Sequence, residues 1–133
     1  MEIKGKITSL LIILSLSFSI HASNVICPSI EYLNQHPEFN HNNDNAVVTE
    51  KGSEIGAVIV RFQKNSQGSP YKKWVHTSIF QGAILCIYEA GPEIEIVLKS
   101  KSSGGWKPRI NNRSWNGTQC VDFVREHCSM TDV

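Results

Sequence analysis

The chain has 133 residues, with 13 basic and 12 acidic side chains and five histidines. This near-neutral balance contains no basic stripe, which argues against a nucleic-acid partner. The length allows a single domain with a modest core.

The first residues have the layout of an export signal. Lys4 and Lys6 precede an uncharged run rich in Leu, Ile and Ser over residues 7–20, and small side chains follow at residues 22–23. The run is short for a membrane span. We therefore expect a signal peptide over residues 1–22 and a single secreted, β-rich domain over residues 23–133. This domain would be secreted or periplasmic, with no membrane span.

All four cysteines follow this leader, at Cys27, Cys86, Cys120 and Cys128. Export implies an oxidising compartment, so an even number of cysteines predicts two disulfides. Of the three possible pairings we favour Cys27 with Cys128, which would tie the termini together, and Cys86 with Cys120. Because the thiols would be oxidised and no histidines have metal-binding spacing, we expect no metal site and no cofactor.

The N-terminal part of the domain predicts one short helix and a loop. Ser29 is placed to cap a helix over residues 30–34, which the proline of His36-Pro37 would end. The asparagine-rich stretch 39–45 favours turns and predicts an exposed loop.

The middle of the chain has the residue composition typical of β-strands. The expected strands, rich in β-branched and aromatic residues, cover residues 46–49, 54–64, 73–81, 83–89 and 93–99. In the third, strict alternation places Trp74 and His76 on one face and Thr77 on the other. The last two form the most regular hairpin, turning at residues 90–92.

The C-terminal part of the sequence predicts shorter elements. Residues 106–110 and 114–115 are candidate short strands, and residues 120–128 end the domain, with Val121, Phe123 and Val124 as apolar contacts. The fold class we predict is mainly β: a small, disulfide-stapled antiparallel β-sandwich or barrel with one short N-terminal helix.

Several of these features together resemble a family of small exported bacterial proteins of unknown function. The resemblance rests on the Cys27-Pro28-Ser29 start, the Cys86-Ile87-Tyr88 strand, and Trp115 followed by Cys120 and Cys128. It implies export, bacterial origin and a disulfide-bonded single domain. Because the family has no established activity, the resemblance implies no catalytic residue.

The tryptophans provide the candidate binding residues. We expect Trp74 in the core, because it lies in an alternating strand, and Trp106 on the surface, because it follows two glycines. Planar rings beside guanidinium groups make good contact surfaces. The predicted binding residues are therefore Trp106, Arg109, Arg113 and Trp115. The alternative is that the tryptophans pack inside against a disulfide.

The function predicted from these features is that of a non-catalytic secreted binding or interaction module. We expect a monomer whose target is an unknown protein or glycan, not a nucleic acid. The alternative is a small secreted hydrolase such as a ribonuclease, in which His76, Lys72 and His127 would supply acid, base and charge stabilisation.

Overall fold

The structure is a computed structural model of the chain and describes residues 24–101, 105–109 and 114–132. The predicted signal peptide lies outside these residues. The elements, in chain order, are β1 (Asn24–Val25), α2 (Ile30–Gln35), the 3-10 helix η2 (Pro37–Phe39), β2 (Asn43–Val48), β3 (Gly56–Phe62), β4 (Lys73–Phe80), β5 (Ala83–Gly91), β6 (Ile94–Ser100), β7 (Lys107–Pro108), β8 (Trp115–Asn116), β9 (Gln119–Cys120), the 3-10 helix η3 (Arg125–His127) and β10 (Met130–Thr131).

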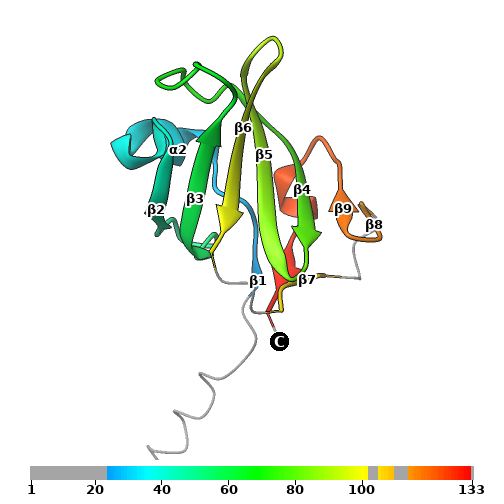
Figure 1. Cartoon of the computed structure of the whole chain (residues 1–133). Helices are drawn as coiled ribbons and strands as arrows, with labels where there is room; N and C mark the ends of the chain where they lie inside the picture. The colour runs from blue at the N-terminus through cyan, green and yellow to red at the C-terminus, as the bar shows by residue number, and fades with distance from the viewer. Residues whose placement is uncertain (1–23, 102–104, 110–113, 133) are drawn as a thin grey trace, which may run out of the picture.

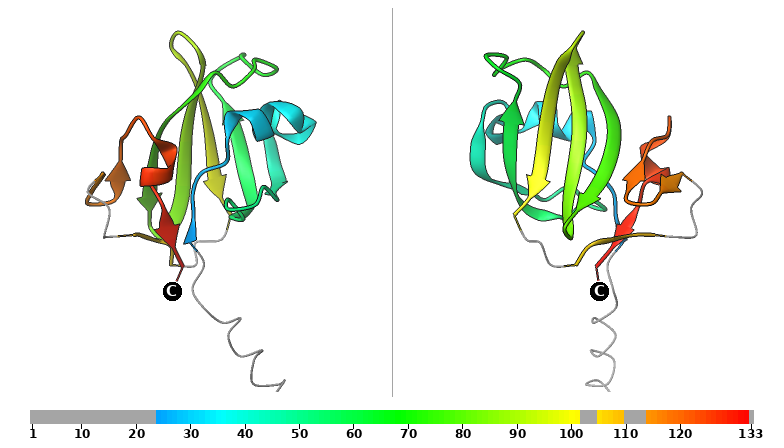
Figure 2. Two further views of the ribbon diagram at one scale, coloured as in Figure 1. Left: turned by 180° about the vertical axis from the view of Figure 1, so that it is seen from behind. Right: turned by 45° about the vertical axis from the view of Figure 1, so that its right-hand side comes forward.

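The described strands form two antiparallel sheets (Figure 1). The larger sheet has seven strands in the order β2-β3-β6-β5-β4-β9-β8, and the smaller has three in the order β1-β10-β7. The N-terminal segment with α2 and the C-terminal segment with η3 lie over the same face of the larger sheet (Figure 2). The predicted fold class, mainly β and antiparallel with one short helix, is confirmed.

The helix α2 forms where the sequence predicts it, because its first turn is capped. The Ser29 hydroxyl accepts a hydrogen bond from the Tyr32 N–H at 3.1 Å. The Glu50 carboxylate accepts hydrogen bonds from the Ser29 N–H at 2.8 Å and from the Ser29 hydroxyl at 2.7 Å. These bonds attach the start of α2 to the segment that follows β2, so its position is fixed relative to the sheet.

The expected loop at residues 39–45 is more ordered than its asparagines suggest. Phe39 is fully buried and β2 already begins at Asn43, so the prediction of an exposed loop is wrong at the two ends of this stretch, whereas residues 40–42 are exposed and irregular as expected. The Tyr71 hydroxyl donates to the Phe39 carbonyl at 2.7 Å, and the Asn34 side chain exchanges two hydrogen bonds with the Tyr71 backbone. Burial raises the pKa of Tyr71 and keeps its hydroxyl a donor.

The hairpin of β5 and β6 is confirmed and supplies the centre of the core. Ile96 lies opposite Tyr88 and both are fully buried, whereas Glu95 lies opposite Glu89 on the other face. The Tyr88 hydroxyl donates to the Pro28 carbonyl at 2.6 Å, which fastens the N-terminal segment across the sheet.

Strand β4 departs from the strict alternation expected for it. Its register with β5 shifts between Trp74 and His76, so Val75 is an extra residue in the strand. A one-residue bulge moves the side chains on one side of it to the opposite face. Trp74 therefore lies on the same face as Thr77, and the prediction that they face opposite ways is wrong.

The two disulfides are Cys27–Cys86 and Cys120–Cys128, so the favoured pairing is wrong. Cys27 lies on the N-terminal segment where it crosses the middle of β5, which brings its Cα within 5.8 Å of the Cys86 Cα. Cys120 and Cys128 close a short loop, with a Cα separation of 5.6 Å. One bridge therefore holds distant parts of the chain, and the other is local.

The two bridges should contribute unequally to stability. The loop-entropy relation gives about 4 kcal/mol for the sequence separation of 59 and about 2.5 kcal/mol for that of 8. Replacing Cys27 and Cys86 together by alanine should therefore lower the free energy of unfolding more than replacing Cys120 and Cys128. Urea denaturation of the two double variants measures this, and equal losses would contradict it.

The register of β6 with β5 leads to a second testable prediction. Ile96→Asp buries a charge with no partner and should lower the free energy of unfolding by at least about 3 kcal/mol. Glu95→Ala removes one of two like charges that face each other, so its effect should stay within about 0.5 kcal/mol. Denaturation of both variants checks the register, and similar losses would show that it is wrong.

Candidate functional site

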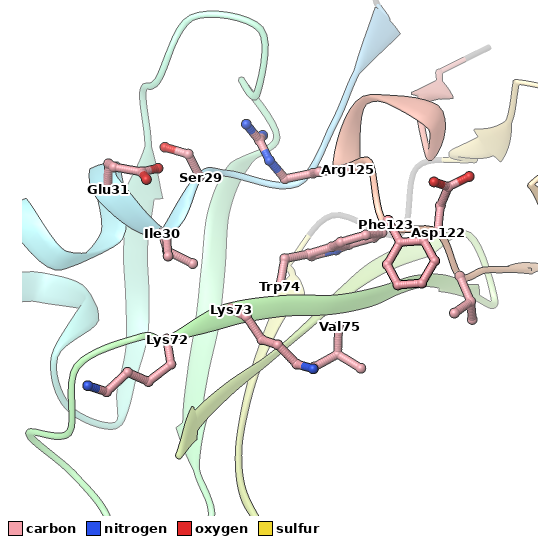
Figure 3. A pocket seen from close by; sticks show the side chains of 11 residues that line it. Ser29, Ile30, Glu31, Lys72, Lys73, Trp74, Val75, Asp122, Phe123 and Arg125 are labelled. Atoms are coloured by element: carbon pink, nitrogen blue, oxygen red, sulfur yellow. The ribbon is translucent and has the colours of Figure 1, made fainter. Parts of the chain in front are cut away.

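An open groove lies between three parts of the chain that are far apart in sequence. Its walls are the start of α2 (29–31), the start of β4 (72–75) and the loop after β9 (121–123) together with Arg125. Its volume is about 590 Å³. Figure 3 shows these side chains around Trp74, whose indole extends from β4 toward the loop. Because it brings polar, charged and aromatic side chains from these three segments together, the groove is the candidate site.

The base of the groove is fixed by the Cys27–Cys86 disulfide through Thr77. The fully buried Thr77 hydroxyl lies 3.1 Å from Cys27 Sγ and 3.1 Å from Trp74 Nε1, which donates a hydrogen bond to it. The bulge at Val75 places Trp74 on this side of the strand. The indole is therefore held in one position, half-buried, with its remaining surface in the groove.

The loop after β9 is closed by the second disulfide and organised by Asp122. This carboxylate accepts hydrogen bonds from the Ser114 hydroxyl, from the Val124 N–H at 2.8 Å and from the His127 ring at 3.1 Å. These bonds hold the pKa of Asp122 well below its ordinary value, and the bond from Ser114 has the largest effect. The ionised carboxylate thus fixes the backbone of the loop.

The apolar residues of this loop face solvent. Phe123 is fully exposed, at 105% of its reference area, and Val121 and Val124 are 62% and 41% exposed. The prediction that these three residues make apolar contacts within the domain is therefore wrong. Both cysteines that close the loop are fully buried, and the residues between them form a short segment at the surface.

The charged residue next to them points the other way. The Arg125 guanidinium is largely covered, with 21% of its side chain exposed, and it donates to the Cys27 carbonyl at 2.5 Å. Its second nitrogen lies 3.4 Å from the Glu126 carboxylate. The loop therefore buries its cation and exposes its phenylalanine, which reverses the usual preference of the two side chains.

The remaining charges at the groove nearly balance. The exposed Lys72 and Glu31 side chains form no hydrogen bond or ion pair with another described residue. The Lys73 ammonium lies 3.9 Å from the Glu89 carboxylate. One free positive and one free negative group leave no strong field of either sign to select a ligand by charge.

Of the four residues predicted to bind, the three that the structure describes do not line the groove. Trp106 and Trp115 are half-buried against the core, so the expected exposure of Trp106 is not found. The Ser129 carbonyl accepts from the Trp115 indole and from the Arg109 N–H, both at 3.0 Å. Arg109 is exposed, and Arg113 lies outside the described residues. A binding role for these four residues stays a prediction.

The hydrolase alternative gains no geometric support from the described residues. The His127 ring bonds to Asp122, and Lys72 lines the groove. His76 is half-buried, and burial lowers its pKa against the opposing effect of Glu95. No hydrogen bond joins any two of the three proposed catalytic residues in the part of the chain that the structure describes. Within those residues, no cluster of three or more His, Cys, Asp or Glu side chains is placed to hold a metal ion.

Comparison with family models, curated proteins and solved structures finds no match for this chain. No helix in the described residues has the length and hydropathy of a membrane span. The two disulfides are consistent with an extracellular or periplasmic protein. The proposal for function therefore rests on the groove and its loop.

The hydrogen bonds to Asp122 predict a local response to acid. A carboxyl whose pKa is lowered in the folded chain stabilises it above its unfolded pKa near 4, and this contribution is lost as the pH falls toward the folded pKa. The protection factor of the Val124 amide, which is its intrinsic exchange rate divided by its observed rate at the same pH, should accordingly fall below about pH 4. In Asp122→Asn the exchange should be faster at neutral pH and should lack this acid-dependent change.

Asp44 offers a matched control, because its pKa is also lowered, by the hydrogen bond from Arg61 on β3. Asp44→Asn should leave the exchange of the Val124 amide unchanged. A loss of Val124 protection in acid that persists in Asp122→Asn would show that another group organises the loop.

Proposed function

We propose that the protein is an exported, non-catalytic binding module that recognises a partner protein at the groove, with Phe123 as its anchor. The observation that carries the proposal is the full exposure of Phe123 in a loop that is otherwise held in place. Burying a phenylalanine against a partner is worth roughly 1.5–3 kcal/mol. Leaving it in water gives the isolated domain no such gain.

The fixed shape of the loop supports recognition by a prepared surface. The Cys120–Cys128 bridge and the hydrogen bonds of Asp122 order the loop before any partner arrives. Ordering in advance lowers the entropy cost of association. Aromatic residues, phenylalanine among them, are enriched at protein interfaces.

The composition of the surface favours a protein over a glycan. Two valines accompany Phe123 on the loop, and Ile30 and Val75 line the facing walls. Aliphatic side chains give a partner's apolar side chains a surface to bury, and the exposed phenylalanine and valines carry no polar group to bond a sugar hydroxyl. Contiguous exposed apolar surface of this kind marks interaction sites.

Export is part of the proposal. The predicted leader over residues 1–22 and the resemblance to small exported bacterial proteins point to a periplasmic or extracellular setting. The two disulfides would persist there. A bacterial, secreted module would meet its partner outside the cytoplasm.

Phe123→Ala tests the proposal, and Phe80→Ala is its matched control. Phe80 is also exposed, at 54%, but it lies at the far end of β4 and does not line the groove. Both variants should unfold within about 0.5 kcal/mol of the parent, as exposed positions do. Only Phe123→Ala should lose binding.

Binding is measured with short linear peptides selected from a random library on the immobilised oxidised protein. We expect the selected peptides to bind the parent and Phe80→Ala equally and to lose affinity for Phe123→Ala. A glycan array tests the alternative that the ligand is a sugar. Sugar binding that depends on Phe123, or a library that yields no peptide dependent on it, would contradict a protein partner.

A further inference from the structure

Strand β4 is paired unequally on its two sides. Strand β5 pairs with it from Lys73 to Phe80. On the other side, β9 pairs only with Thr77 and Ser78, and the Thr118 carbonyl adds one bond to the Ile79 N–H. Figure 1 shows β9 beside the lower part of β4 only. Among the described residues, the first half of β4 therefore has no strand on its outer side.

This unpaired edge forms one wall of the groove. Residues 72–75 line it, and the chain leaves the line of β9 at Val121, which lines the groove from the opposite side. The groove thus occupies the place that β9 would fill if it continued past Cys120. A backbone edge with unpaired N–H and C=O groups is a template for another strand.

We propose that the groove takes an extended segment of the partner protein, which adds to residues 73–76 as a short antiparallel strand in line with β9. This inference rests on the proposed function and names how the partner is held. Main-chain hydrogen bonds would supply part of the affinity, and alternate side chains of the segment would contact Trp74 and Phe123.

The charges of the groove fit this mode of binding. The free groups at its rim, Lys72 and Glu31, are of opposite sign, so they select no strongly charged ligand. Recognition then depends on shape, on the two aromatic rings and on the backbone. The backbone is a feature that every extended segment presents.

The edge also carries the features that keep sheets from pairing at random. Lys73 lies in it, and the bulge at Val75 interrupts its regular ladder with β5. Charged residues and bulges limit uncontrolled pairing between copies. Lys73 and the bulge would keep the added strand short. The loop with Phe123 would cover the outer side of that strand, so only a segment that fits both walls of the groove would bind well.

Backbone methylation of the peptide tests the inference directly. The probe is the tightest-binding peptide selected from the random library, made in two forms that are N-methylated at alternate amides. An added strand presents every second amide to β4, so one form should bind more weakly by about tenfold or more. The other form should keep its affinity within a small factor.

Amide hydrogen exchange gives the matching readout on the protein. The peptide should slow exchange within residues 73–76 and leave the opposite edge of the same sheet, strand β2, unchanged. Equal binding of the two methylated forms, or unchanged exchange at residues 73–76, would overturn strand addition. The proposed function would survive either result if the peptide still required Phe123, so the two failures are distinguishable.

Discussion

The Cys27–Cys86 disulfide is the constraint on which the rest of the structure depends. It holds the N-terminal segment against the middle of β5, and the neighbouring carbonyl groups then become fixed acceptors. The Pro28 carbonyl accepts from Tyr88 of the core, and the Cys27 carbonyl accepts from Arg125 of the C-terminal loop. All three walls of the groove are thus positioned from one short stretch of chain.

The exposure of Phe123 follows from what Arg125 does. The Arg125 guanidinium donates to the Cys27 carbonyl beside the bridge, which also accepts a longer bond, of 3.4 Å, from the Ser53 hydroxyl. Directing the arginine inward fixes the orientation of a loop that is already closed at both ends by a disulfide. Phe123, two positions earlier, is then directed outward. The exposed ring is therefore a product of the fold's internal hydrogen bonding.

The regular parts of the fold could be predicted from the sequence, and the site could not. Alternation identified the hairpin of β5 and β6, and Ser29 identified the cap of α2, because both signals are local. The bulge at Val75 has no local signal, and an even count of cysteines does not give their pairing. Phe123 could have been found from the close spacing of Cys120 and Cys128, since so short a bridged loop has no interior in which to place a ring.

The assembly of the groove from both halves of the chain has a consequence for when the protein can act. Its walls include residues from positions 29 and 125, and the bridge that orients the first of them joins Cys27 to the distant Cys86. During synthesis the N-terminal and central segments emerge first, and the groove is incomplete until the segment with Arg125 has been made and the bridges have closed. Under the proposed function, a partner would therefore bind only an oxidised chain in which both segments are present.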